Sequence, residues 1–368
     1  MARPVYLVRK LNAMAAKPPK ILFISPLNGY MVVQDIRLLK AHFRVVEVRH
    51  PWSKRRWLNP WYLVVEFLQL LWHLPGTHAV VVSFGGYGAL FPPLMGRLTR
   101  TPVYIILHGA DAVSMPSIRY GSLRKPWLKR VLKVAYQNAT CLLPVSEALL
   151  RTHNPAYPVV GEQTQGVLHF FPGLTTPTTV VNNGIDLARW PWGVFEVREP
   201  RSFFTVCVPG QIERKGLKGI LELAGRLPNC AFYVAGMNAA DLPLPIPPNV
   251  KPLGFLQHEE LVAYYQRSTF FIQLALFEAF GLAVIEAMAC GCIPVVSAVC
   301  GLPERVGEAG FVVPTTDPDG LQAFVEGHVL TAKDLPARSQ RVREQVATHF
   351  QESNRAEQLV NILSTLRS

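Results

Sequence analysis

Short apolar, β-rich runs alternate with helical patterns along most of this chain, and this alternation limits the possible folds more than any other feature. The first unit consists of KILFISPL at 20–27, a helical pattern at 31–43 and VVEV at 45–48. Strand, helix and strand in this order build a parallel sheet that is covered by helices. We therefore predict an α/β fold.

The alternation forms two series that are separated by an irregular segment. The first series continues through AVVVSF (79–84), PVYIILHG (102–109), a basic helical stretch near 123–138 and ATCLLPVS (139–146). The second series contains FFTVCVPG (203–210), a helix at 216–227, AFYVAG (231–236), a run at 250–255, a helix at 258–267, FFIQLA (270–275), a helix at 282–290 and PVVSA (294–298). Residues 150–200 between them are rich in Pro, Gly and Thr.

The length of 368 residues suits two domains of ordinary size. We predict a basic N-terminal tail at 1–19, a Rossmann-like domain at 20–195, a second Rossmann-like domain at 196–340 and a C-terminal helix at 341–368. Doubly wound sheets bind ligands beyond the carboxyl ends of their strands, so two facing sheets would form a cleft with the functional residues in the loops after the strands.

Positive charge is concentrated in the first third of the chain. Residues 1–133 contain 20 Lys and Arg against 4 Asp and Glu, whereas the remainder contains 17 against 21. This asymmetry suggests an acidic partner for the N-terminal part, such as anionic lipid, nucleic acid or a phosphorylated acceptor. No recognised nucleic-acid motif accompanies the charge, so we expect no nucleic-acid partner.

The six cysteines form no CxxC pair, and we interpret them as small core residues of a reduced, cytoplasmic protein. The basic N-terminus lacks an apolar region of the length that a signal peptide needs. The apolar segment at 61–74 contains Glu66 and Gln69 and is too short to span a bilayer, so we predict a helix in the core or at an interface.

Two carboxylates interrupt the otherwise apolar run FEAFGLAVIEAMACGCIPVV at 277–296, namely Glu278 and Glu286. Buried carboxylates usually pair, shift their pKa or bind a ligand. The helix predicted from Leu282 onward would offer free amides at Gly281 and Leu282, which favour an anion. Carboxylates also accept hydrogen bonds from paired hydroxyls, as a sugar ring or a ribose supplies them.

Two interpretations of these acids remain open at this point. One is a nucleotide-sugar site, with Glu278 on the sugar and Glu286 on the ribose. The other is structural, with Glu286 paired to a core arginine and Glu278 capping the helix.

Polar turns follow other strands as well. His108 and Asp111, in HGAD at 108–111, come directly after a strand, and the histidine is either incidental or contacts a polar substrate. Arg214 and Lys215, in PGQIERKG, combine cations with backbone N–H groups before a helix, which favours phosphate, although basic turns are also common on surfaces.

Asn28 and Gly29 follow the first strand and are candidates for a cleft or acceptor loop, together with Asp111.

These motifs resemble those of the retaining glycosyltransferases of family 4, which have the GT-B fold. The match comprises the E-x7-E arrangement at Glu278 and Glu286, GLPE at 301–304, GFVVPTTDPDGL at 310–321, HGAD at 108–111, LPVSEAL at 143–149 and NNGID at 182–186. The resemblance covers most of residues 20–330.

The resemblance implies a role for each matching residue. Glu278 would lie at the donor sugar, Glu286 at the donor ribose, Lys215 at the diphosphate and His108 at the sugar. It further implies a metal-independent enzyme without a cofactor, whose N-terminal domain takes a glycan or lipid-linked acceptor and whose second domain takes a nucleotide-sugar donor. The C-terminal helix is expected to cross back to the N-terminal domain.

Three departures from the family pattern bear on this expectation. Gln211 stands where the family usually has arginine, so that one diphosphate cation is missing or is supplied by Arg214. Gly29 stands alone where adjacent glycines are usual, and Leu274-Ala275 replace Pro-Ser.

A membrane partner is a further hypothesis. The stretch RKPWLKRVLKVA at 124–135 reads either as a basic amphipathic helix on the inner face of an anionic membrane or as a surface helix whose apolar stripe packs on the sheet. KRRWLNPW at 54–61 is a second basic and aromatic patch.

Other parts of the sequence suggest two alternative functions. FGGYGAL at 84–90 suggests a nicotinamide dehydrogenase, but it lacks the third glycine and the acidic residue about 20 positions further on. Gln211 makes a catalytically silent sugar-nucleotide or partner-binding protein the other alternative.

Overall fold

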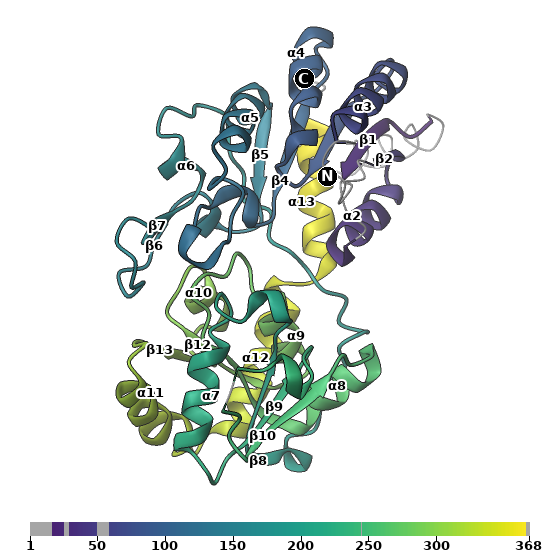
Figure 1. Ribbon diagram of the computed structural model, residues 1–368. Helices are drawn as coiled ribbons and strands as arrows, with labels where there is room; N and C mark the ends of the chain where they lie inside the picture. The colour runs from purple at the N-terminus through teal and green to yellow at the C-terminus, as the bar shows by residue number, and fades with distance from the viewer. Residues whose placement is uncertain (1–16, 26–28, 50–58, 244, 366–368) are drawn as a thin grey trace, which may run out of the picture.

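The computed structural model describes residues 17–25, 29–49, 59–243 and 245–365, and it contains two parallel sheets (Figure 1). The first sheet has the order β2-β1-β3-β4-β5. Its strands are β1 (Lys20–Ser25), β2 (Arg44–Arg49), β3 (Ala79–Ser83), β4 (Val103–Leu107) and β5 (Cys141–Pro144). The pairing is parallel throughout, which confirms the predicted α/β class.

The second sheet has the order β10-β9-β8-β11-β12-β13 and is also parallel. Its strands are β8 (Glu199–Val206), β9 (Ala231–Ala235), β10 (Val250–Gly254), β11 (Ser268–Gln273), β12 (Ile293–Ser297) and β13 (Phe311–Val313). Both sheets contain inner strands that are fully buried, for example VYIIL in β4 and IPVVS in β12. Helices on both faces of a parallel sheet bury both rows of side chains, which is why these strands are apolar without alternation.

Helices connect the strands of each sheet. The helices around the first sheet are α2 (Tyr30–Lys40), α3 (Asn59–His73), α4 (Phe91–Thr99) and α5 (Pro126–Asn138). The helices around the second sheet are α7 (Leu217–Arg226), α8 (His258–Arg267), α9 (Leu282–Ala289), α10 (Leu302–Val306), α11 (Pro318–Phe324) with the π-helical turn Val325–Val329, and α12 (Leu335–His349). The α7 sequence shows why these helices form where they do. Leu217, Ile220 and Ala224 recur at helical spacing and are all buried.

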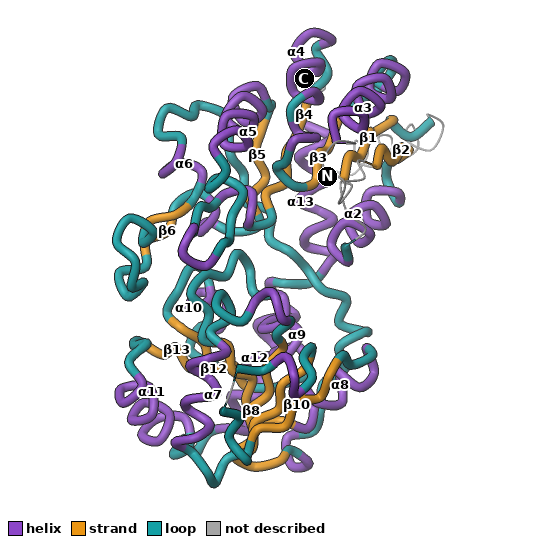
Figure 2. The backbone as a smooth tube through the Cα atoms, viewed as in Figure 1, coloured by secondary structure: helices purple, strands orange, loops and turns teal. Residues whose placement is uncertain are grey.

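The segment between the two sheets is mostly irregular, as Figure 2 shows. It contains the short antiparallel pair β6 (Thr152–His153) and β7 (Thr164–Gln165) and the one-turn helix α6 (Val167–Phe170). Brief 3-10 turns lie at 87–89, 110–112, 116–118, 147–149, 195–197, 209–211 and 239–241. The exact limits of the domains stay predictions.

The C-terminal segment differs from the single helix expected at 341–368. It forms α12 and then α13 (Glu352–Ser364), which are separated at Phe350 and Gln351. Gln351 is extended and pairs with the linker, because Ile185 N donates to Phe350 O at 2.8 Å and Glu352 N donates to Ile185 O at 3.0 Å. A tertiary contact breaks this helix, since no Pro or Gly marks the position.

The two helices serve different sheets. α12 packs against α9 and β12, whereas α13 packs against α2 of the first sheet. A buried ion pair fixes α13 there, because Arg355 donates to both carboxylate oxygens of Asp35 at 2.6 and 2.8 Å. The last described helix therefore packs on the unit that holds the first described strand, as Figure 1 shows by the yellow helix beside the purple one.

All six cysteines are free and five of them are fully buried, which confirms their interpretation as core residues. Among the helices of the described residues, none has the length and apolar content to cross a bilayer.

Candidate active site

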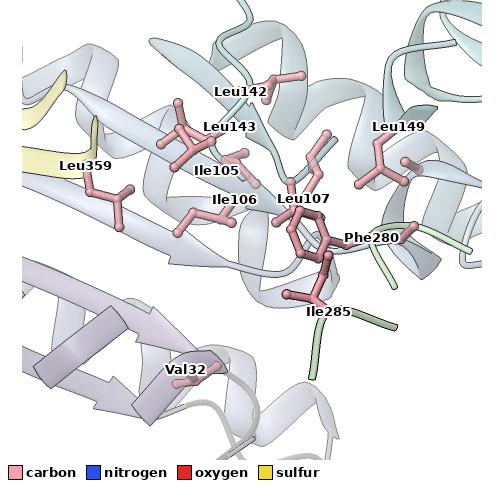
Figure 3. Close-up of a cluster of buried hydrophobic side chains, with 14 of the residues drawn as sticks. Val32, Ile105, Ile106, Leu107, Leu142, Leu143, Leu149, Phe280, Ile285 and Leu359 are labelled. Carbon is pink, nitrogen blue, oxygen red and sulfur yellow. The ribbon is translucent and has the colours of Figure 1, made fainter. Parts of the chain in front are cut away.

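Two loops from different sheets meet at the proposed site. Residues 274–281 join β11 to α9, and residues 108–111 follow β4. A Cβ atom added to Gly109, whose φ is +143°, would lie 2.9 Å from the Cβ of Ala279. Figure 3 shows Phe280 and Ile285 of the second unit packed beside Leu107 and Leu149 of the first. The chain thus brings the loops of Glu278 and His108 together.

Glu278 binds the two predicted phosphate cations. Its Oε2 lies 3.2 Å from Arg214 Nη1 and 3.5 Å from Lys215 Nζ. Gln273, the last residue of β11, donates from Nε2 to the same oxygen at 3.1 Å and accepts from Lys215 Nζ at 2.8 Å. Burial by itself would raise the pKa of Glu278, but Lys215 and Arg214 outweigh it and lower that pKa to about 2. Glu278 is therefore ionised near neutral pH.

Gln211 has a direct structural role beside these cations. Its Oε1 accepts a hydrogen bond from Arg214 Nη2 at 2.9 Å, while Arg214 Nη1 also donates to the carbonyl of Phe277 at 3.1 Å. The ring of Tyr120, from the first unit, lies 5.2 Å from the guanidinium carbon. Arg214 is thus held in one place by groups from both units. It lies beside Gln211, which replaces the arginine usual in the family, so Arg214 can supply the second cation for a diphosphate.

The turn before α7 requires a glycine to place these cations. Gly216 has a φ of +69°, and a Cβ atom there would lie 1.8 Å from the carbonyl oxygen of Leu274. Only glycine tolerates both the left-handed backbone and the close approach of the neighbouring loop. The turn is closed further by hydrogen bonds from Lys215 N to Gln211 O and from Leu276 N to Arg214 O.

Helix α9 begins at Leu282, as predicted, with Gly281 as its N-cap in a left-handed conformation. No side chain caps this helix, so the interpretation of Glu278 as its cap is wrong. The first-turn amides of Leu282 and Ala283 have no acceptor within the helix and form a site that favours an anion.

Glu286 lies one turn inside α9 and is half-buried. It accepts a hydrogen bond from the Tyr265 hydroxyl at 3.3 Å. No ion pair to Glu286 occurs among the described residues, so the alternative in which it pairs with a core arginine has no support. Burial raises the pKa of Glu286 to about 7, partly opposed by Tyr265 and Lys215. The two acids of one apolar run therefore occupy opposite electrostatic environments.

His108 is held rigidly at the end of β4. Its Nε2 lies 3.0 Å from the Ser83 hydroxyl, and its ring stacks on Phe84 with centroids 4.0 Å apart. Phe84 has a φ of 72°, a conformation that costs energy for a side chain of this size. Burial, and to a smaller extent Arg355, lower the pKa of His108 to about 3, so that the imidazole is neutral.

Asp111 stabilises this turn through hydrogen bonds to its backbone. Its buried carboxylate accepts backbone hydrogen bonds from His108, Gly109 and Gly85 at 2.8–3.1 Å. Asp111 therefore holds the backbone of the loop in place. The prediction that Asp111 itself contacts a ligand has no support in this geometry.

The remaining cleft-loop candidates are Asn28, which lies outside the described residues, and Gly29. Gly29 precedes α2 with an ordinary extended backbone, and a Cβ atom there would have open space around it. Nothing in this local geometry requires glycine.

Sequence reasoning missed Gln273 and Tyr120. Gln273 is a buried polar residue at the carboxyl end of a strand, and that position is itself a signal. Tyr120 lies in an irregular segment, and its proximity to Arg214 and Phe277 follows only from the packing of the two units.

Comparison with known proteins gives a consistent result. Residues 195–338 match the family of glycosyl transferases group 1. The chain is 38% identical over 76 residues to the O-antigen chain mannosyltransferase B of Escherichia coli, which covers 21% of this chain and 20% of that protein. It is 33% identical over 187 residues to the glycogen synthase of Mycobacterium tuberculosis, which covers 47% of this chain and 43% of that protein. The chain thus spans less than half the length of these curated relatives.

The solved structure of the sucrose-phosphate synthase from Thermosynechococcus elongatus is similar over nearly the whole length. The two share 17% sequence identity with a TM-score of 0.71, and the alignment covers 95% of this chain and 99% of the other. This likeness extends the comparison from the second unit to both, and it confirms the predicted arrangement of two Rossmann-like domains. The second unit of this chain is therefore similar to the group 1 glycosyl transferases, and the chain as a whole has the GT-B fold.

Proposed function

We propose that this protein is a retaining glycosyltransferase that moves a sugar from a nucleotide-diphosphate sugar to a glycan or lipid-linked acceptor. The observation that carries the proposal is the cluster of Arg214, Lys215 and Glu278, with contacts of 3.2 and 3.5 Å, next to the uncapped start of α9. Two cations and helix amides are suited to a diphosphate, while a permanently ionised carboxylate is suited to sugar hydroxyls.

In this arrangement the donor diphosphate would bind between Lys215, Arg214 and the first-turn amides of α9. These groups stabilise the negative charge that develops on the diphosphate as the bond from the sugar carbon to the phosphate oxygen breaks. We propose that protein cations, rather than a metal ion, supply this stabilisation. The acceptor hydroxyl forms the new bond on the same face and loses its proton to the departing phosphate oxygen.

Glu278 pairs with the two cations in the structure. A diphosphate carries more charge and would take its place at Arg214 and Lys215. Glu278 would then be released toward the sugar, and His108, neutral and fixed by Ser83, would offer a second polar contact. Glu286 would accept hydrogen bonds from the ribose.

The test combines binding and turnover. Thermal shifts with a panel of nucleoside diphosphates and nucleotide sugars should show stabilisation by one base, which names the donor class. With that donor, Glu278→Gln should reduce turnover by at least about 100-fold, the range for loss of one key active-site interaction. Glu326→Gln, an exposed acid near α11, is the matched control and should leave turnover unchanged.

Full turnover by the Glu278→Gln variant would reject the role given to this residue. Donor binding without transfer or hydrolysis by the wild-type chain, over a range of acceptors, would instead support the catalytically silent alternative.

We further propose where in the cell this protein acts. A reduced cytoplasmic chain with an excess of positive charge in residues 1–133 suits a peripheral position on the inner face of an anionic membrane, where lipid-linked acceptors are found. The relatives named above include an O-antigen chain mannosyltransferase, and this supports a glycan acceptor in the present chain.

A further inference from the structure

Helix α3 is mostly apolar, and one of its apolar faces lies in solvent. The exposed side chains are Trp61, Val64, Leu68, Leu71 and Trp72. They recur at helical spacing on one face, and Trp72 has 82% of its surface exposed. The opposite face packs on the sheet through Leu70. A surface helix of a soluble domain normally has polar residues on its outer face, and none of the five exposed positions is polar.

The neighbouring helix α4 continues this surface and adds positive charge. Leu98 of α4 is 85% exposed. Leu71 of α3 and Arg100, just after α4, line one hollow together. Arg100 and Arg97 also line a second hollow of about 690 Å³, with Lys20 at its edge. The sole acid within α3 and α4 is Glu66, which is buried.

Helix α5 is the other candidate for membrane contact, but most of its large apolar side chains are buried in the core. Leu128, Leu132 and Tyr136 are buried against the sheet, which leaves Trp127 as its one large apolar side chain that is mostly exposed. Its basic residues therefore lie on an ordinary solvated face. The second basic patch, at 54–61, lies outside the described residues except for its last positions.

We propose that the α3–α4 face, made of the five exposed α3 residues and Leu98 with Arg97 and Arg100 at its edge, docks onto the surface of an anionic lipid bilayer. The inference deepens the membrane part of the proposed function and rests on it. Tryptophans near both ends of an apolar helix suit the interfacial region of a bilayer, and adjacent arginines suit its anionic headgroups.

Charge favours a bilayer over a second copy of the chain. In a two-fold symmetric dimer the same patch supplies both sides of the interface, so Arg97 and Arg100 could pair only with groups that this patch itself offers. No exposed acid on the described α3 or α4 residues is available to neutralise them. An anionic bilayer supplies both the apolar layer and the negative charge.

The placement of this face is also compatible with catalysis. Figure 1 shows α3 and α4 at the end of the first unit that points away from the second sheet. The unit with Arg214, Lys215 and Glu286 would therefore stay in solution, open to a soluble donor, while the first unit rests on the lipid.

The experiment is flotation of the full chain with phosphatidylcholine vesicles, with or without phosphatidylglycerol. The wild-type chain should float with the anionic vesicles. The double variant Leu68→Glu/Trp72→Glu should lose at least about 10-fold in vesicle partitioning, because two exposed apolar anchors are replaced by charges that the lipid repels. Trp127→Glu on α5 is the matched control and should float as the wild-type chain does.

A second variant tests the electrostatic part. Arg97→Gln/Arg100→Asn should weaken binding to anionic vesicles and make it less dependent on salt, and Asn suits the left-handed φ of 57° at position 100. Unchanged flotation of Leu68→Glu/Trp72→Glu would overturn the proposal. So would a dimer in light scattering that this variant converts to a monomer, since that identifies a second copy as the occupant.

Nucleotide-induced thermal shifts separate this inference from the proposed function. If the α3 variant keeps the nucleotide response of the wild-type chain, its fold and donor site are intact and the flotation result concerns the membrane alone. If wild-type chain floats but no nucleotide stabilises it, the enzymatic proposal fails and the docking surface stands.

Discussion

At the scale of single residues, the two acids of the segment 277–296 show how position decides charge. Glu278 lies between two cations and is ionised, with a pKa of about 2. Glu286, eight positions further on, faces a tyrosine hydroxyl and has a pKa raised to about 7 by burial. One acid is thus poised to bind at any physiological pH, whereas the other changes its charge within that range.

The pKa of Glu286 leads to a prediction about stability. Between pH 4.5 and 7 the folded chain keeps a proton on Glu286 that the unfolded chain releases, so the free energy of unfolding falls as the pH rises through this window. Glu286→Gln removes the buried charge. Without ligand it should be more stable than the wild-type chain at pH 8, by up to about 3 kcal/mol, with a smaller difference at pH 5.

Thermal unfolding at both pH values measures this effect, with Glu326→Gln as the control at an exposed acid. An equal difference in Tm at pH 5 and pH 8 would contradict the assigned cause, since a pure packing effect does not titrate.

The sequence predicted the acids, the two cations and His108 as candidates, because they lie in or next to turns at the carboxyl edge of a sheet, and their roles stay predictions. It did not predict that Gln211 would orient Arg214, or that Tyr120 would lie against the same guanidinium. These contacts depend on loop conformations and on the packing of two units that are distant in sequence, which local patterns do not encode.

At the scale of elements, glycines at strand-to-helix turns set where the cations lie. Gly216 allows the loop of Leu274 to approach so closely that the β8–α7 and β11–α9 connections share hydrogen bonds. The residues that bind the proposed diphosphate thus come from two turns that are packed against each other.

Gly216→Ala should destabilise the protein by at least about 2 kcal/mol, because it adds a left-handed alanine and a clash with backbone. It should also weaken nucleotide binding, since Arg214 and Lys215 immediately precede it. Gly219→Ala, inside α7 with its nearest neighbour at 3.8 Å, is the control and should stabilise by up to about 1 kcal/mol. Denaturant unfolding and nucleotide titration measure both quantities.

The helices and strands were predictable where local sequence signals define them and unpredictable where contacts between distant segments do. Most strands and α8 were predicted within a few residues, because apolar runs and amphipathic periods are local signals. The separation of α12 from α13 was not predicted, because a hydrogen-bonded pairing between Ile185 and Gln351 causes it. Ile185 and Gln351 are far apart in the sequence, with the whole second sheet between them, so local patterns do not reveal this pairing.

At the scale of the whole molecule, the first structural unit is discontinuous in sequence. Leu359 and Leu363 of α13 are buried in the core of that unit. His78 Nε2 donates to the carbonyl of Leu363 at 2.8 Å, and the Tyr104 hydroxyl donates to that of Ile362 at 3.4 Å. Strands β3 and β4 therefore rely on the last helix of the chain.

Leu359→Ala should destabilise the first unit by about 2–5 kcal/mol, the usual cost of such a buried truncation. Hydrogen exchange should show reduced protection of amides in β3 and β4, with little change in β8 to β13. Glu357→Ala on the exposed side of α13 is the control. Loss of protection confined to α13 itself would show that the helix is an accessory to this core.

The late position of α13 has a consequence for synthesis. The ribosome makes the first unit before the second, and domains commonly fold in the order in which they emerge. Here the Asp35–Arg355 pair and the leucines of α13 reach the first unit only after the whole second unit has been translated. Until α13 has been made, the first unit lacks this ion pair and these leucines, so it can complete its core only after the second unit has been translated.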